Sequence, residues 1–159
     1  MRFGDAVSEV RMNDGPFVPS SIGALLDFAL SLEAEARCRM NAAIGDVDVM
    51  QWREEIAFCA HDHEVRCNRL KRLRREQSEE VLRRSLVGLP GEFALRMPCG
   101  STGACDRIRA ALALEEAAAG FYDAAGRVVA DVPGRLGRSL GKLAAESRGM
   151  AELLRKLLR

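Results

Sequence analysis

An approximate internal repeat constrains the fold of this chain more than any other feature. The segment ALSLE at 29–33 returns as ALALE at 111–115, 82 residues later. In each copy a second glutamate follows 31 residues after the first, which pairs Glu33 with Glu64 and Glu115 with Glu146. Apolar residues around these glutamates recur at steps of three and four, the period of an amphipathic helix. The sequence therefore predicts two similar helical hairpins.

Four segments carry this helical period. They are 20–41, 49–77, 105–127 and the segment that follows the turn at 131–134 and ends near 158. Ser20 or Ser21 is expected to cap the first helix, and Asp46 or Asp48 the second. Because the turn inside each hairpin is short, its two helices are expected to be antiparallel neighbours.

The segment between the hairpins, at about 78–104, decides how they are joined. It is long enough to run the length of the helices, which would make the second and third helices parallel. Within it EVLRRSLVGL is expected to form a short helix, and prolines and glycines make the rest irregular. The expected fold is all-α, a single four-helix bundle domain of two antiparallel hairpins at 20–158, after a loose lead-in at 1–19.

Three of the four expected packing seams contain a glutamate near their middle. Glu33 lies in the seam of the first helix, Glu115 in that of the third and Glu146 in that of the fourth. The most apolar stripe of the second helix is Val49, Ile56, His63 and Leu70, and Glu64 lies one residue away from it. The equal spacing within the hairpins places all four glutamates at a similar height.

Four carboxylates at one level of a helical core are chemically demanding. Burying an ionised carboxylate costs several kcal/mol, and four of them repel one another. They must be protonated, hydrated, paired with arginine or bound to cations. Arg37, Arg66 and Arg148 lie within one turn of these glutamates and are candidate partners. Two divalent metals would also neutralise them, and oxygen-rich sites suit iron or manganese.

With these glutamates in place, the chain resembles the ferritin-like superfamily, in particular the rubrerythrin-type di-iron domain. The resemblance covers about 20–158 and is carried by ALSLE, AHDHEVRC at 60–67, ALALEEAAAGFYDAAG at 111–126 and LAAESRGM at 143–150. It implies a ferritin-like fold and two iron ions, with manganese or no metal as alternatives, held by Glu33, Glu64, Glu115 and Glu146. It also implies reduction of oxygen or peroxide with an external electron donor, and a homodimer.

The histidines of the family pattern are missing. Where the family has Glu-x-x-His on its second and fourth helices, this chain has Cys67 after Glu64 and Gly149 after Glu146. His61 and Cys67 are therefore candidate replacement ligands, or else ordinary surface and core residues. Tyr122, two turns after Glu115, could hydrogen-bond a carboxylate or simply fill the core. The alternative function is a metal-free, catalytically silent bundle that serves as an interaction or scaffold module.

Composition argues against several other classes. The net charge is +1, no apolar run is long enough to cross a membrane, and the first 20 residues lack the apolar region of a secretory signal. Five cysteines without a CxxC pair indicate free thiols rather than a disulfide framework or a zinc ribbon. The basic stretch 66–84 lacks interleaved aromatic residues and is expected to be a solvated helix face. We therefore expect a cytoplasmic protein that binds neither nucleic acid nor membrane.

Overall fold

The protein was analysed as a computed structural model, which describes residues 18–45, 47–89 and 103–159. Its elements are α1 (Ile22–Ile44), the 3-10 helix η1 (Val47–Trp52), α2 (Arg53–Glu76), α3 (Glu79–Arg83), α4 (Ala104–Val128) and α5 (Leu136–Leu157). The described residues contain no β-strand, and only one isolated bridge joins Ser21 to Ser85. The all-α class predicted from the sequence is confirmed.

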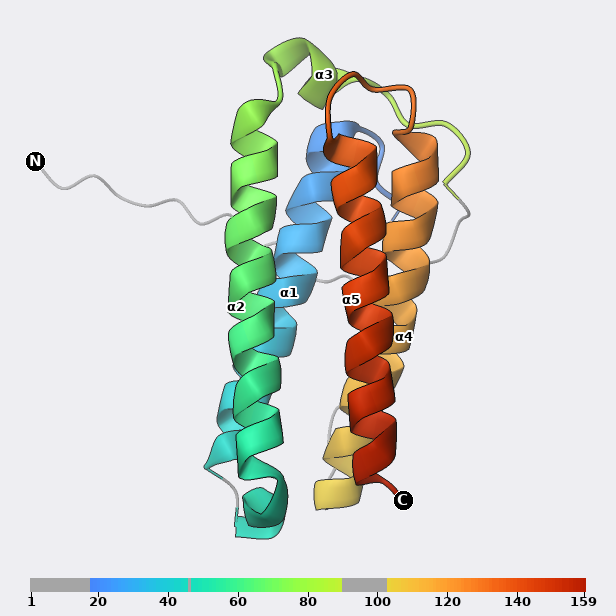
Figure 1. Cartoon of the computed structure of the whole chain (residues 1–159). Helices are drawn as coiled ribbons and strands as arrows, with labels where there is room; N and C mark the ends of the chain where they lie inside the picture. Colours follow the sequence, from blue (N-terminus) through green and yellow to red (C-terminus); the bar gives the residue numbers. More distant parts are fainter. Residues whose placement is uncertain (1–17, 46, 90–102) are drawn as a thin grey trace, which may run out of the picture.

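Four long helices lie side by side and form two antiparallel hairpins, α1 with α2 and α4 with α5 (Figure 1). The chain leaves α2 at one end of the molecule, passes through α3, and enters α4 at the opposite end (Figure 1). As a result α2 and α4 run in the same direction, as the length of the connection predicted. Residues 90–102 of that connection and residues 1–17 of the lead-in lie outside the described part of the chain.

The helix ends differ in how well the sequence predicted them. Ser21 caps α1, because its side chain accepts a hydrogen bond from the backbone N–H of Ala24 at 3.1 Å. The N-cap residue of α2, which begins at Arg53 after a turn of 3-10 helix, is Trp52 and makes no capping bond; of the two predicted caps, Asp46 lies outside the described residues. The helix expected in the connection is confirmed only in part, since α3 ends at Arg83.

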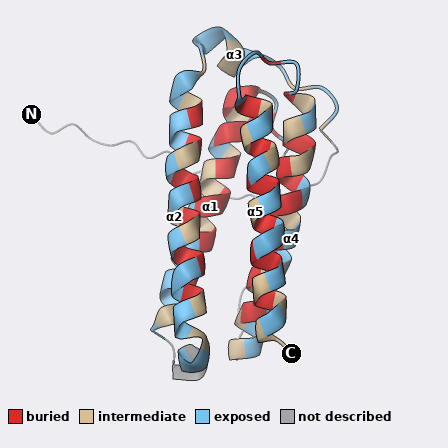
Figure 2. Cartoon of the chain, in the orientation of Figure 1, coloured by how far each residue is buried: buried red, intermediate tan, exposed pale blue. Residues whose placement is uncertain are grey.

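The core consists of two apolar clusters with a polar layer between them. One cluster is built around Leu26, Leu70, Phe121 and Leu140, and the other around Met40, Ile56, Ile108 and Leu154. The inward faces of all four long helices are buried along their length (Figure 2). The buried polar residues belong to neither apolar cluster: Glu33, His63, Arg66, Glu115 and Ser147. This layer is where a functional site would lie.

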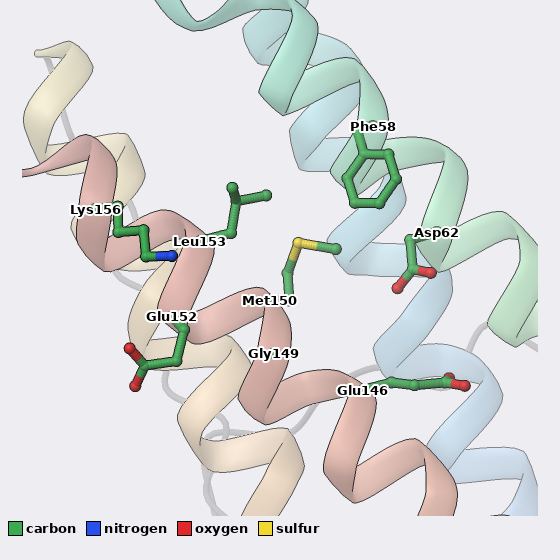
Figure 3. A pocket seen from close by; sticks show the side chains of 8 residues that line it. All are labelled: Phe58, Asp62, Glu146, Gly149, Met150, Glu152, Leu153 and Lys156. Atoms are coloured by element: carbon green, nitrogen blue, oxygen red, sulfur yellow. The ribbon is translucent and has the colours of Figure 1, made fainter.

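The side of the molecule between α2 and α5 is less closely packed than the two hairpins are internally. A groove of about 410 Å³ opens there, with Phe58 and Asp62 of α2 facing Met150 and Leu153 of α5 (Figure 3). Gly149 and Glu146 also line it. Among the described residues, no helix combines the length and the hydrophobicity that crossing a bilayer requires.

Candidate functional site

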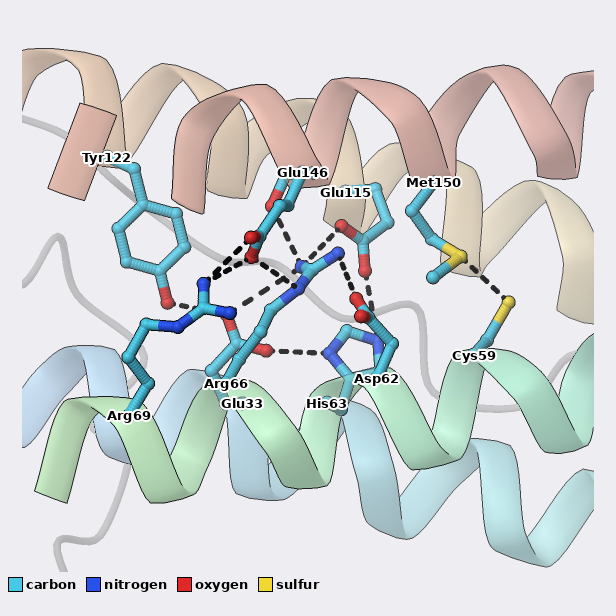
Figure 4. A network of polar contacts seen from close by, with 11 residues as sticks. Glu33, Cys59, Asp62, His63, Arg66, Arg69, Glu115, Tyr122, Glu146 and Met150 are labelled. Atoms are coloured by element: carbon cyan, nitrogen blue, oxygen red, sulfur yellow. Dashed lines mark hydrogen bonds and ion pairs between the residues drawn. The ribbon is translucent and has the colours of Figure 1, made fainter. Parts of the chain in front are cut away.

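Two glutamates are the buried acidic residues of the polar layer. Glu33 comes from the middle of α1 and Glu115 from the middle of α4, and both are fully buried. Each occupies the packing seam in which the sequence placed it. Both carboxylates point into the space between the helices and meet side chains of α2 (Figure 4). The prediction that these two residues lie in the packing seams is therefore confirmed.

His63 of α2 lies between the two carboxylates and contacts both. Its Nδ1 is 2.7 Å from Oε2 of Glu33, within hydrogen-bonding distance. Its Nε2 is 2.9 Å from Oε1 of Glu115, a close charge contact whose angle is poor for a hydrogen bond. An imidazole with an anionic oxygen beside each nitrogen is stabilised in the form that carries a proton on both nitrogens. His63 is thus placed as an imidazolium.

The Arg66 guanidinium supplies the second buried cation. Its Nη1 donates to Oε2 of Glu115 at 3.1 Å and to the hydroxyl of Ser147 at 3.0 Å, and lies 3.9 Å from Glu33. Its Nη2 is 2.7 Å from the carboxylate of Asp62, one turn earlier on α2. The side chain is completely buried although it belongs to the basic stretch that the sequence assigned to a solvated face. That assignment is wrong for Arg66.

Tyr122 completes the coordination of Glu33. Its hydroxyl donates to Oε1 of Glu33 at 2.5 Å, so each oxygen of that carboxylate has a partner. The ring is fully buried and packs against Phe121. Of the two roles that the sequence left open for Tyr122, the hydrogen bond to a carboxylate is the one observed.

Three partly exposed charged side chains close the layer on the α2–α5 side. Arg69 donates to both oxygens of Glu146, at 2.8 and 2.6 Å, and Glu146 lies 4.0 Å from Nε of Arg66. The side chains of Arg69, Glu146 and Asp62 are between 25% and 28% exposed. These residues separate the buried network from the groove, in which Asp62 and Glu146 form part of the wall.

The protonation of the network follows from these contacts. Burial by itself lowers the pKa of His63, but the contacts with Glu115 and Glu33 outweigh it and raise the pKa to about 9. Burial raises the pKa of Glu115, whereas His63 and Arg66 lower it more strongly, so the net shift is downward. Burial and the neighbouring Glu33 raise the pKa of Tyr122. Glu115 is therefore ionised, and the positively charged His63 and Arg66 lie beside it.

The remaining predicted site residues lie outside this buried layer. Glu64 is 45% exposed and pairs with Arg37 at 3.7 Å. His61 is exposed, on the outer face of α2. Cys67 is buried, and burial together with Glu33 raises its pKa, which keeps it a neutral thiol. The structure thus brings Glu33, Glu115 and Glu146 towards one centre and leaves Glu64 and His61 away from it.

Helix rotation explains the two glutamates that lie elsewhere than the spacing predicts. A residue on an α-helix turns about 100° from its predecessor, so burial of His63 carries Glu64 to the flank. In α5 the buried stripe is Leu136, Leu140, Leu143, Ser147 and Leu154. This stripe puts Ser147 in the core and Glu146 at its edge. The spacing of the glutamates fixed their height along the helices but not the direction in which they point.

Sequence reasoning missed His63, one of the two cations that neutralise the network, as a partner of the glutamates. His63 carried a usable signal, because it interrupts an otherwise apolar stripe of the second helix. Arg66 was correctly considered as a partner for a glutamate, and Arg37 also pairs as considered. Arg148 does not, since it forms an ion pair with Asp123. Nothing local distinguishes Arg66 from the other arginines of α2, so only its position opposite Ser147 and Glu115 reveals it.

The residues as arranged do not fit a pair of divalent metal ions. The space between the carboxylates is taken by the Arg66 guanidinium and the His63 imidazole, which already balance their charge. Glu64 points away, and Glu146 is held by Arg69. In the described ranges no three His, Cys, Asp or Glu side chains converge as metal ligands would.

No family model, no curated protein and no solved structure matches this chain.

Proposed function

We propose that this chain is a ferritin-like four-helix bundle that functions without metal, as a scaffold or interaction module. The observation that carries the proposal is that Arg66 and His63 lie between the buried carboxylates of Glu33 and Glu115. These side chains perform the charge balancing that two metal ions perform in the rubrerythrin-type domain that the chain resembles. The carboxylates then stabilise one helix arrangement instead of binding a cofactor.

Electrostatics supports this interpretation. A buried carboxylate is tolerated when a cation and further hydrogen bonds compensate its lost hydration. Glu33 has His63 and Tyr122, and Glu115 has His63 and Arg66. A divalent cation entering this layer would have to displace a guanidinium that is itself hydrogen-bonded to Ser147 and paired with Asp62. Binding would therefore start with the loss of several charge-assisted contacts.

The competing function is a di-metal carboxylate protein with oxygen or peroxide chemistry. Its support is the pair of buried glutamates on α1 and α4, together with the tyrosine that contacts one of them. It requires Arg66 to move out of the layer and Glu146 to leave Arg69. The two functions predict opposite results on exposure to metal.

Metal loading distinguishes them. The purified chain is incubated with excess Fe(II) under anaerobic and aerobic conditions, and separately with Mn(II), then desalted and measured by elemental analysis. We expect no stoichiometric metal, the same melting temperature with and without a chelator, and no peroxide consumption.

Two bound ions per chain together with a raised melting temperature would contradict the metal-free proposal. The Glu115→Gln variant is the matched control, because it removes a core carboxylate and leaves surface acids intact. Metal that this variant retains is bound adventitiously at the surface, whereas metal that it loses was bound in the core.

A further inference from the structure

We propose that the exposed face of α2 is a self-association surface, on which a second copy of this chain packs its own α2 in the antiparallel direction. The inference names a partner for the scaffold role proposed above and rests on it. The surface is defined by Glu54, Phe58, His61, Val65, Arg69 and Arg72, hereafter the α2 face. These residues lie on one side of the helix, opposite the buried stripe of Ile56, His63 and Leu70.

Two apolar side chains form the centre of the α2 face. Phe58 is 59% exposed and Val65 is 39% exposed, although both belong to a helix whose inner side is well packed. They are seven residues apart, so they lie two turns apart on one line of the helix. That spacing is the repeat through which two helices pack against each other. Phe58 also lines the groove beside Leu153, which extends the apolar surface towards α5.

The charges of α2 change sign along its length. Glu54 and Glu55 lie in the first turn, and Glu54 makes no ion pair with another described residue. Beyond Val65 the same face carries Arg72, which is exposed, whereas the neighbouring Arg69 is held by Glu146. A helix that is acidic at one end and basic at the other is complementary to itself when the second copy runs in the opposite direction, and repels itself when the two run in parallel.

A two-fold axis near His61 and Asp62 satisfies both features together. With that axis, Phe58 of one copy lies opposite Val65 of the second copy, and the reverse contact is made by symmetry. The same register places Glu54 within about one helical turn of Arg72 of the second copy. The apolar contacts and the charged contacts are therefore both formed in one antiparallel register. This favours a second copy of the chain as the partner that binds the α2 face.

Sedimentation velocity over a range of protein concentrations tests the association. We expect a dimer whose fraction rises with concentration, and at least a tenfold lower association constant for Phe58→Asp. Val87→Asp is the matched control, because Val87 is 85% exposed but lies outside α2, and it should leave the association constant unchanged. Glu54→Arg should weaken the dimer, and combining it with Arg72→Glu should restore it.

Cysteine crosslinking tests the register. In a background with serine at Cys38, Cys99 and Cys105, His61→Cys should form a disulfide-linked dimer, because the two-fold axis brings this position close to itself. Phe58→Cys should not, since antiparallel packing separates the two copies of residue 58 by roughly 10 Å along the axis. Crosslinking of Phe58→Cys but not of His61→Cys would overturn the antiparallel arrangement.

The outcomes separate this inference from the proposed function. The self-association surface is overturned if the chain stays monomeric at every concentration, or if Phe58→Asp leaves the dimer intact. Either result would assign the α2 face to a different protein partner. Neither result bears on metal binding, which is measured by elemental analysis. Conversely, two bound metal ions would overturn the metal-free role while the dimer could still be observed.

Discussion

Glu33 of α1 and Glu115 of α4 occupy equivalent places in the two hairpins, and both are fully buried. The helices that follow them differ. At the position of the repeat where α2 has Arg66, α5 has Arg148, which is exposed and pairs with Asp123. Where α2 has His63, α5 has Ala145, which is exposed. Among the described residues, all the buried positive charge of the core thus comes from one of the four long helices.

This difference shows how an approximate repeat can build an asymmetric core. Two like-charged glutamates cannot neutralise each other, so one hairpin must supply cations and the other must leave room for them. The second hairpin does so with a small residue, since Ser147 faces Arg66. The division of roles between α2 and α5 suggests three experiments that would break or sharpen the comparison.

The largest effect is expected at Arg66. Replacing it with methionine leaves the buried carboxylates with one cation instead of two, and we expect the free energy of unfolding to fall by about 3–5 kcal/mol. Arg148→Met, at the equivalent place in the other hairpin, should cost about 0.5 kcal/mol or less, because its ion pair is exposed. Urea denaturation at neutral pH measures both. Equal losses would mean that the hairpins are not divided in this way.

A smaller effect is expected from pH, through His63. Its pKa is raised from 6.5 to about 9 in the folded chain, so its contribution is fully present below pH 6.5 and is lost as the pH rises through 9. We expect the free energy of unfolding to fall by on the order of 3 kcal/mol over that range. His63→Gln should remove most of this slope. His61→Gln, on the outer face of the same helix, should leave the slope unchanged, and a loss of slope there would contradict the assignment.

The smallest effects concern the glycines of the second hairpin. A Cβ at Gly149 would meet no atom within 4 Å, so Gly149→Ala should stabilise the chain by about 0.5–1 kcal/mol through helix propensity. A Cβ at Gly126 would lie 3.2 Å from the backbone oxygen of Gly137, where α4 and α5 approach closely. Gly126→Ala should therefore destabilise by about 1 kcal/mol or more. Thermal unfolding of the two variants compares the open position at Gly149 of α5 with the close contact that Gly126 of α4 makes with α5.

The sequence was most informative where a pattern is periodic. The seam of the first helix, from Ile22 through Glu33 to Met40, is buried as predicted. The seam of the third helix is also confirmed, except that Leu112 is half-buried. For the fourth helix Leu136, Leu143 and Met150 of the predicted seam are buried, but its other positions are displaced, because Leu, Ala and Ser in α5 allow more than one apolar face. That displacement exchanged Glu146 for Ser147 in the core.

The candidate site was predicted only in part for a related reason. Spacing gave the height of Glu33 and Glu115 along their helices and indicated that burying them required compensation. The spacing could not show whether metal ions or cationic side chains balance the negative charge of these glutamates, since either would do so. The choice depends on which face of α2 turns inward, and α2 carries polar or charged residues on every side.

By itself the sequence determined the helical hairpins, their antiparallel pairing and the burial of one glutamate in each, because these follow from local periodicity and from the length of the turns. Tertiary structure decided which cations meet those glutamates. Arg66 and His63 become buried only when α2 packs against α1 and faces Ser147 across the core, bringing together groups that are 30 to 81 residues apart in the chain. The energy of such contacts depends on distance and burial, which no local pattern encodes.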